Sequence, residues 1–223
     1  MTSPARWRVL QVADSAFPTG GFAHSAGLEA AVHAGEARTS ERLESWLHAH
    51  LWNVGTSSLP FVAATHDRPF DVWAIDALAD AQMTNHVANR ASRTQGRAFA
   101  ATCARVFDEQ AVAELARAAA SRSVASHLAP VFGAVLALLG VDRREALALH
   151  LLLALRAITS AAIRLGLVGP HEAQRMQRRH TSALEEVVAA CASLDPGEAA
   201  NAAPLVDLFG ATHDRLDSRL FQS

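Results

Sequence analysis

Arginine is the residue type whose spacing in this sequence indicates a binding surface. Four arginines lie between residues 81 and 107, a stretch without Asp or Glu: Arg90, Arg93, Arg97 and Arg105. At 100° per residue on a helix, they fall within one sector about 120° wide. Guanidinium groups match carboxylates, so Arg90, Arg93 and Arg97 are candidates for docking an acidic partner. The alternative is a solvated face, or arginines that pair with acids on neighbouring helices.

Histidine is the second candidate, because the chain has 11 of them. Two metal ligands on one helix face need a spacing of three or four residues, and no two histidines in the sequence have it. The sequence therefore predicts no catalytic residue, no metal site and no bound cofactor. Clustering of distant histidines, such as His24, His127 and His150, stays open as a route to a metal-binding or small-ligand-binding protein, or an enzyme.

The C-terminal residues form a third candidate. Leu220 and Phe221 are an apolar pair close to the chain end, where chains usually fray. The pair either folds back onto the core of its own chain or binds a partner.

A glycine-containing segment, residues 18–29, reads Pro-Thr-Gly-Gly-Phe-Ala-His-Ser-Ala-Gly-Leu-Glu. Two adjacent glycines before a helix could cradle an anion. The segment matches neither the dinucleotide-binding pattern nor the phosphate loop, so it more simply fixes a turn between two helices.

The composition excludes several functions. The 20 basic residues are all arginine, and there is no tyrosine, which rules out a phosphate-loop lysine, a Schiff-base lysine and a tyrosine acid. A net charge of −2 argues against nucleic-acid binding, which needs many unbalanced cations. Two cysteines without a metal or redox spacing, and a start without a signal peptide, predict a cytoplasmic protein.

The elements that must position these residues are helices. Apolar positions repeat with helical periodicity, and no segment alternates as a strand would. An uncharged stretch at 123–141 contains Pro130 and Gly133 and is interpreted as a buried helix rather than a membrane span. Helices are expected at about 6–13, 25–34, 40–54, 57–66, 70–81, 84–107, 109–120, 130–139, 143–165, 171–192 with a break near His180, and 204–217. The fold class is all-α: one domain, 1–223, of about ten mostly short helices packed in a bundle-like array.

At several of these motifs the sequence resembles the UreF family of urease accessory proteins. The resemblance is carried by residues 10–29, 90–96, 127–133, 160–166 and 218–223, and so covers nearly the whole chain. It implies an all-α protein that is not an enzyme. It also implies a homodimer that assembles with a UreD-type (UreH-type) accessory protein and a UreG-type GTPase to couple GTP hydrolysis to nickel insertion into apo-urease.

The resemblance also assigns roles to residues by position. The tail residues that would bind the UreD-type partner are Arg219, Leu220, Phe221 and Ser223. The residues of the matching motifs that would shape the structure near that surface are Pro18, Gly20, Gly21, Phe22, Ser25, Gly27, Leu28, Glu29, His127, Pro130, Gly133, Arg164 and Gly166. After Arg164 the chain departs from many bacterial members, which weakens the assignment of a GTPase-regulating role to that loop.

Overall fold

The structure is a computed structural model that describes residues 4–18, 20–121 and 123–222. Within these residues it has helices and no strand, which confirms the all-α prediction. The α-helices are α1 (Pro4–Val12), α2 (Leu28–His33), α3 (Ser40–Asp67), α4 (Val72–Gln82), α5 (His86–Val106), α6 (Gln110–Ala120), α7 (Leu128–Leu138), α8 (Arg143–Arg164), α9 (Pro170–Arg179), α10 (Thr181–Cys191) and α11 (Pro204–Thr212). Short 3-10 helices are η1 (Gly21–Ala23), η2 (Pro69–Asp71), η3 (Pro196–Glu198) and η4 (His213–Arg215).

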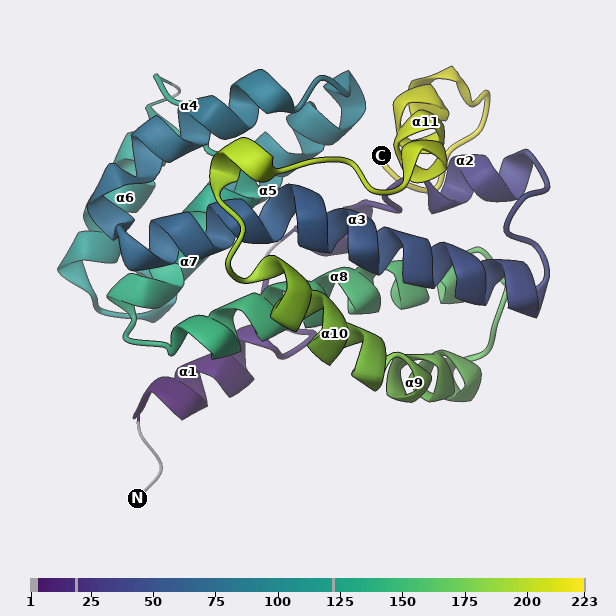
Figure 1. Cartoon of the computed structure of the whole chain (residues 1–223), viewed down its shortest axis with the longest axis horizontal. Helices are drawn as coiled ribbons and strands as arrows, with labels where there is room; N and C mark the ends of the chain where they lie inside the picture. The colour runs from purple at the N-terminus through teal and green to yellow at the C-terminus, as the bar shows by residue number, and fades with distance from the viewer. Residues whose placement is uncertain (1–3, 19, 122, 223) are drawn as a thin grey trace.

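The longest helix, α3, runs through the middle of the molecule, and the chain between α10 and α11 crosses it (Figure 1). The sequence predicts two helices here, 40–54 and 57–66, separated at Gly55, and this prediction is wrong. The glycine serves close packing instead, because a Cβ at Gly55 would lie 2.2 Å from Cγ1 of Val187 on α10.

Proline at position 60 does not break α3 either. Proline has no N–H to donate to the carbonyl four residues earlier, which leaves the oxygen of Thr56 without its helical partner. The backbone N–H of Ala200 donates to that oxygen at 3.2 Å. The hydroxyl of Thr56 donates in turn to the carbonyl of Ala200 at 2.7 Å. The segment that crosses α3 is therefore fixed at the position where the proline interrupts the helical bonding.

The α3–α7 crossing forms the centre of the larger of two hydrophobic clusters. Phe99 and Phe132 stack there with ring centroids 4.9 Å apart, and both are buried. The second cluster lies around α2, the first half of α3 and the second half of α8, and includes Leu28 and Phe221. Since α3 contributes to both clusters, they are joined by one continuous element, as the predicted single domain requires. The domain boundaries themselves stay a prediction.

The helix α8 is long and apolar enough to cross a membrane by length and composition, the one such case in the described part of the chain. In the most apolar part of α8, 56% of the stretch is buried against the rest of the protein, so its apolar side chains pack in the core. The uncharged stretch at 123–141 forms α7, whose residues 129–136 are all buried, as predicted.

Other element boundaries follow the sequence with local differences. The predicted break near His180 is present, between α9 and α10. The helix expected at 25–34 begins only at Leu28, because Ala26 and Gly27 both have positive φ. The helix expected at 204–217 ends at Thr212 and continues as η4.

The close approach of α7 to α3 at Gly133 predicts an effect on stability. A Cβ at Gly133 would lie 2.2 Å from the carbonyl oxygen of Val62 in the backbone of α3. Gly133→Ala should therefore force α3 and α7 apart and lower the free energy of unfolding by about 2–3 kcal/mol, measured by urea denaturation. Gly197→Ala is the control, because nothing lies within 4 Å of a Cβ there. Equal stability of the two variants would contradict the close crossing.

Candidate functional site

The carboxylate of Glu29 is buried, and the C-terminal tail supplies its hydrogen-bond donors. The side chain lies at the start of α2 and is 1% exposed. Its oxygens accept from the backbone N–H of Leu220 at 2.7 Å and of Phe221 at 3.3 Å. The ring Nε2 of His213 lies 2.8 Å from the same carboxylate. A buried carboxylate needs such partners, so the tail and α2 stabilise each other. We call this arrangement the tail seat: Glu29, His213, Leu220 and Phe221, together with Arg164.

The arginine of the tail seat, Arg164, comes from the end of α8. Its guanidinium carbon lies 4.1 Å from the centroid of the Phe221 ring, a cation–π contact. Its Nη2 donates to the carbonyl of Leu220 at 3.2 Å. The tail seat thus joins three motifs that are far apart in the sequence: residues 18–29, the end of α8 and the chain terminus.

The two apolar tail residues have opposite environments. Phe221 is 5% exposed and packs in the second hydrophobic cluster, so the alternative in which the tail folds back onto its own chain describes this side chain. Leu220 is 59% exposed, and the side chain of Arg219 is 43% exposed. A partner can therefore reach both of these side chains in this conformation. Ser223 lies outside the described residues.

The glycine-containing segment brings α2 against α11. Gly27 has φ +86°, and a Cβ there would lie 2.8 Å from the backbone nitrogen of Gly210. Upstream, the carbonyl of Pro18 accepts from the hydroxyl of Thr102 on α5 at 2.9 Å. The segment is therefore a packed turn between α1 and α2, as the sequence predicts.

The remaining residues of the matching motifs have structural surroundings. Gly20 has positive φ before η1, which contains Gly21 and Phe22. Ser25 and Leu28 are buried at the start of α2. Pro130 lies in the first turn of α7, and Gly166, with positive φ, follows the end of α8.

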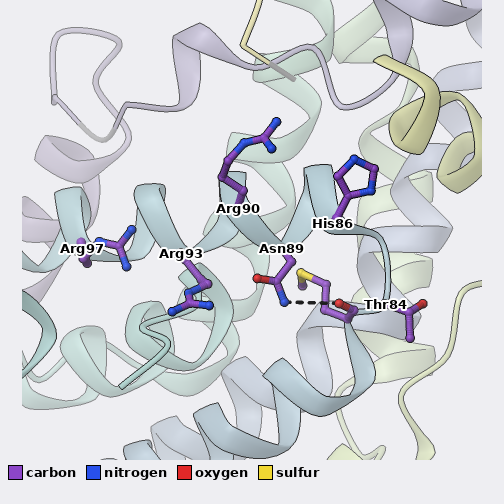
Figure 2. Close-up of a pocket in the computed structure, with 7 residues that line it drawn as sticks. Thr84, His86, Asn89, Arg90, Arg93 and Arg97 are labelled. Carbon is purple, nitrogen blue, oxygen red and sulfur yellow. Dashed lines mark hydrogen bonds between the residues drawn. The ribbon is translucent and has the colours of Figure 1, made fainter. Parts of the chain in front are cut away.

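The four arginines on one side of α5 form an arginine stripe: Arg90, Arg93, Arg97 and Arg105. The first three line an open groove of about 500 Å³ on α5. Figure 2 shows Arg90, Arg93 and Arg97 in succession along the helix, with His86 toward its start. The groove has no acid in its lining, which consists of Met83, Thr84, His86, Asn89, Arg90, Arg93 and Arg97. Arg105 does not line it. We call this surface the arginine groove.

Two acids outside the groove pair with the stripe. Arg90 Nη2 lies 3.0 Å from each carboxylate oxygen of Asp214, and Arg93 Nη1 lies 3.9 Å from Asp80. Arg97 donates to the carbonyl of Ala125 at 3.4 Å. Pairing with acids of neighbouring elements, the alternative that the spacing left open, therefore describes Arg90 and Arg93.

The carboxylate of Asp214 also contacts the tail. Arg219 Nη1 lies 3.3 Å from it, and His86 Nε2 lies 3.4 Å away. The hydrogen bond from Arg90 lowers the pKa of Asp214 below its usual value, with smaller contributions from the nearby charges of His86 and Arg219. One ionised carboxylate thus connects the arginine groove with the tail.

A second acid network holds the start of α7. Buried Asp76 on α4 accepts from the backbone N–H groups of Ser126 and His127, both at 2.7 Å. The ring of His127 is buried, with Nε2 2.9 Å from Asp80. The hydrogen bond from Asn89 is the main cause of a lowered pKa at Asp80, followed by the one from His127. His127 is therefore a structural residue of the α4–α7 contact.

The distant histidines border one partly open cavity of about 680 Å³, to which His24, His50, His127 and His150 all contribute. Burial lowers the pKa of His50 and of His150 to about 4, so both are neutral at pH 7. Burial and the nearby His213 lower the pKa of His24. No group of three His, Cys, Asp or Glu side chains close enough to hold a metal ion occurs among the residues that the structure describes.

Asp76, His213 and Asp214 are not among the residues that the sequence predicts. The sequence does contain a pattern that marks Asp76, because this residue falls on the apolar face of α4 with Val72, Ile75 and Ala79. A carboxylate on a buried face needs donors nearby. Nothing in the sequence marks Asp214 as the partner of Arg90, 124 residues away.

A family model described as UreF matches residues 37–181. The chain is 38% identical to "Urease accessory protein F" from Arabidopsis thaliana, over 100% of this chain and 94% of that protein. It is 36% identical to the protein of the same name from Oryza sativa subsp. indica, over 99% and 86%. It is also 26% identical to "Urease accessory protein UreF" from Paenarthrobacter aurescens, over the full length of both.

The tail seat predicts which tail residue matters for stability. Phe221→Ala should lower the free energy of unfolding by about 2 kcal/mol, at the low end for a buried aromatic because the tail can detach locally. In a chain of this size the melting temperature should fall by roughly 4–8 °C. Leu220→Ala is the matched control and should stay within about 0.5 kcal/mol, since this side chain is exposed. Equal melting temperatures of the two variants would contradict the seat.

The neutral buried histidines predict acid sensitivity. The folded pKa of His50 and of His150 is about 4, below the ordinary 6.5, so the unfolded chain binds more protons between these values. Stability is then fully present above pH 6.5 and is lost as the pH falls toward 4, by about 3 kcal/mol for each histidine.

Urea denaturation at several pH values between 4.5 and 7 measures this loss. Replacing both residues with Gln should flatten the pH dependence. His48→Gln on the exposed side of α3 is the control and should keep the native slope. An unchanged slope in the double variant would show that other groups cause the acid sensitivity.

Proposed function

Because the chain belongs to the UreF family of urease accessory proteins, and so has an accessory role in urease maturation, we propose that it is the non-enzymatic adaptor of that process. In this proposal the chain assembles with a UreD-type (UreH-type) protein and a UreG-type GTPase. The complex couples GTP hydrolysis to nickel insertion into apo-urease, and nickel is the cargo of the complex rather than a resident cofactor of this chain.

The observation that carries the proposal is similarity over the full length of curated accessory proteins. The tail seat supports a docking role for the terminus, because it holds the backbone at 220–221 against Glu29 while Leu220 points into solvent. An apolar side chain on a preorganised backbone loses less conformational entropy on binding than one on a frayed end. Arg219 and Leu220 are therefore the proposed contacts to the UreD-type partner, and Phe221 is proposed to act by holding the tail.

The arginine groove is the second proposed contact surface. Three arginines from successive turns of α5 line it and no acid does, which suits a partner with surface carboxylates. The groove and the tail are adjacent through Asp214, so one assembly can use both.

A homodimer is part of the proposal. Exposed large apolar side chains on α1 and α11 support it: Trp7, Leu10, Leu205 and Leu208. Light scattering over a concentration series tests this point, and a mass that stays near 24 kDa at high micromolar concentration would count against it. The proposed location is the cytoplasm, supported by two buried cysteines that form no disulfide, Cys103 and Cys191.

Leu220→Glu tests the docking role. It should leave the melting temperature within about 2 °C of the native value, because the side chain is already exposed. Copurification with the UreD-type partner should weaken by about thirtyfold, as for the loss of an interface anchor worth about 2 kcal/mol. Urease activity in cells that express the whole accessory set should fall in parallel.

Phe70→Glu is the matched control, since Phe70 is 85% exposed in η2, within the segment that joins α3 to α4. It should leave copurification and urease activation unchanged. Native copurification of Leu220→Glu would remove the docking role, and full urease activation without this chain would remove the adaptor function.

A further inference from the structure

The arginine groove already contacts a carboxylate of its own chain. Asp214, in η4, places both oxygens 3.0 Å from Nη2 of Arg90. This is the position that a carboxylate of an acidic partner would take on the same guanidinium. The carboxylate is ionised at neutral pH, because its hydrogen bond with Arg90 lowers its pKa.

The contact is partly exposed and can therefore be exchanged. The side chain of Arg90 is 56% exposed and that of Asp214 is 30% exposed. Ion pairs with this exposure contribute little to stability, because water and salt screen both charges. A second carboxylate can replace Asp214 on Arg90 at small cost, while Arg219 and His86 still contact Asp214.

The spacing of the groove indicates the shape of the partner. Arg90, Arg93 and Arg97 are three and four residues apart on α5, which separates them by about 4.5 and 6 Å along the helix axis. Carboxylates three and four residues apart on another helix have the same separations. A helix with acids in this pattern therefore repeats the spacing of the three arginines along α5, whereas an extended acidic segment has a different repeat.

We propose that Asp214 is a built-in competitor for the arginine groove, displaced from Arg90 when an acidic helix of a partner protein docks there. The proposal rests on the proposed function for the existence of such a partner, but not for the chemistry of the groove. Competition by an internal carboxylate limits docking to partners that supply several carboxylates in register, since a single charge gains nothing over Asp214.

The test uses the full chain and a synthetic helical peptide with glutamates at positions i, i+3 and i+7. An isomer of the same composition carries these glutamates on different faces. Fluorescence anisotropy at low salt should show that the native chain prefers the matched peptide. Asp214→Asn should bind it about three- to fivefold more tightly, the gain expected from removing one exposed competing charge.

Two control variants separate the groove from other effects. Asp217→Asn makes the same charge change at an exposed residue of the same loop and should stay within about twofold of the native affinity. Arg219→Ala removes the tail contact to Asp214 but keeps Arg90, and should not tighten binding. Arg90→Glu should abolish the preference for the matched peptide.

Equal or weaker binding of the matched peptide by Asp214→Asn would overturn the proposal, as would no peptide binding or equal binding of the isomer. Preference for an oligonucleotide over the matched peptide would overturn the choice of an acidic helix. The peptide assay contains no urease component. If Asp214→Asn does not tighten peptide binding but the chain still activates urease, only this inference is removed. If Asp214→Asn tightens peptide binding but urease is activated without the chain, only the adaptor function is removed.

Discussion

The C-terminal part of the molecule depends on one buried carboxylate. Glu29 is 1% exposed, and among the described residues its carboxylate contacts two backbone N–H groups and the ring of His213. The tail covers this carboxylate and supplies two backbone N–H donors in place of the water that would otherwise hydrate it. Phe221 fills the adjacent apolar cluster and Arg164 covers its ring. The terminus is thus a structural element of the fold.

One charged residue, Asp214, connects the tail with the arginine groove. Asp214 contacts Arg90 on α5 and Arg219 on the tail, while His213, one residue earlier, contacts Glu29. Two neighbouring residues of η4 therefore connect the surface of α5, the start of α2 and the chain end. A proposed adaptor needs such a connection, because binding at one surface has to change the affinity at another.

The sequence was sufficient for what depends on local pattern. Helical periodicity predicted the all-α class, the arginine spacing predicted a stripe on one face, and the apolar pair marked the tail. It was insufficient where a residue's role depends on a distant neighbour. Gly55 reads as a helix break, because its packing contact with Val187 lies more than 130 residues away. The choice between self-burial and exposure at the tail also required Glu29, 191 residues from Leu220.

The tail seat also affects how the protein is made. Chains emerge from the ribosome with the N-terminus first, and helices form as they emerge. Glu29 and α2 emerge early, whereas Leu220 emerges 191 residues later. Every nascent chain therefore passes through a stage in which the carboxylate of Glu29 is hydrated and the apolar surface beneath Phe221 is uncovered. A chain truncated before Leu220 lacks this cover, so the apolar surface beneath Phe221 stays exposed.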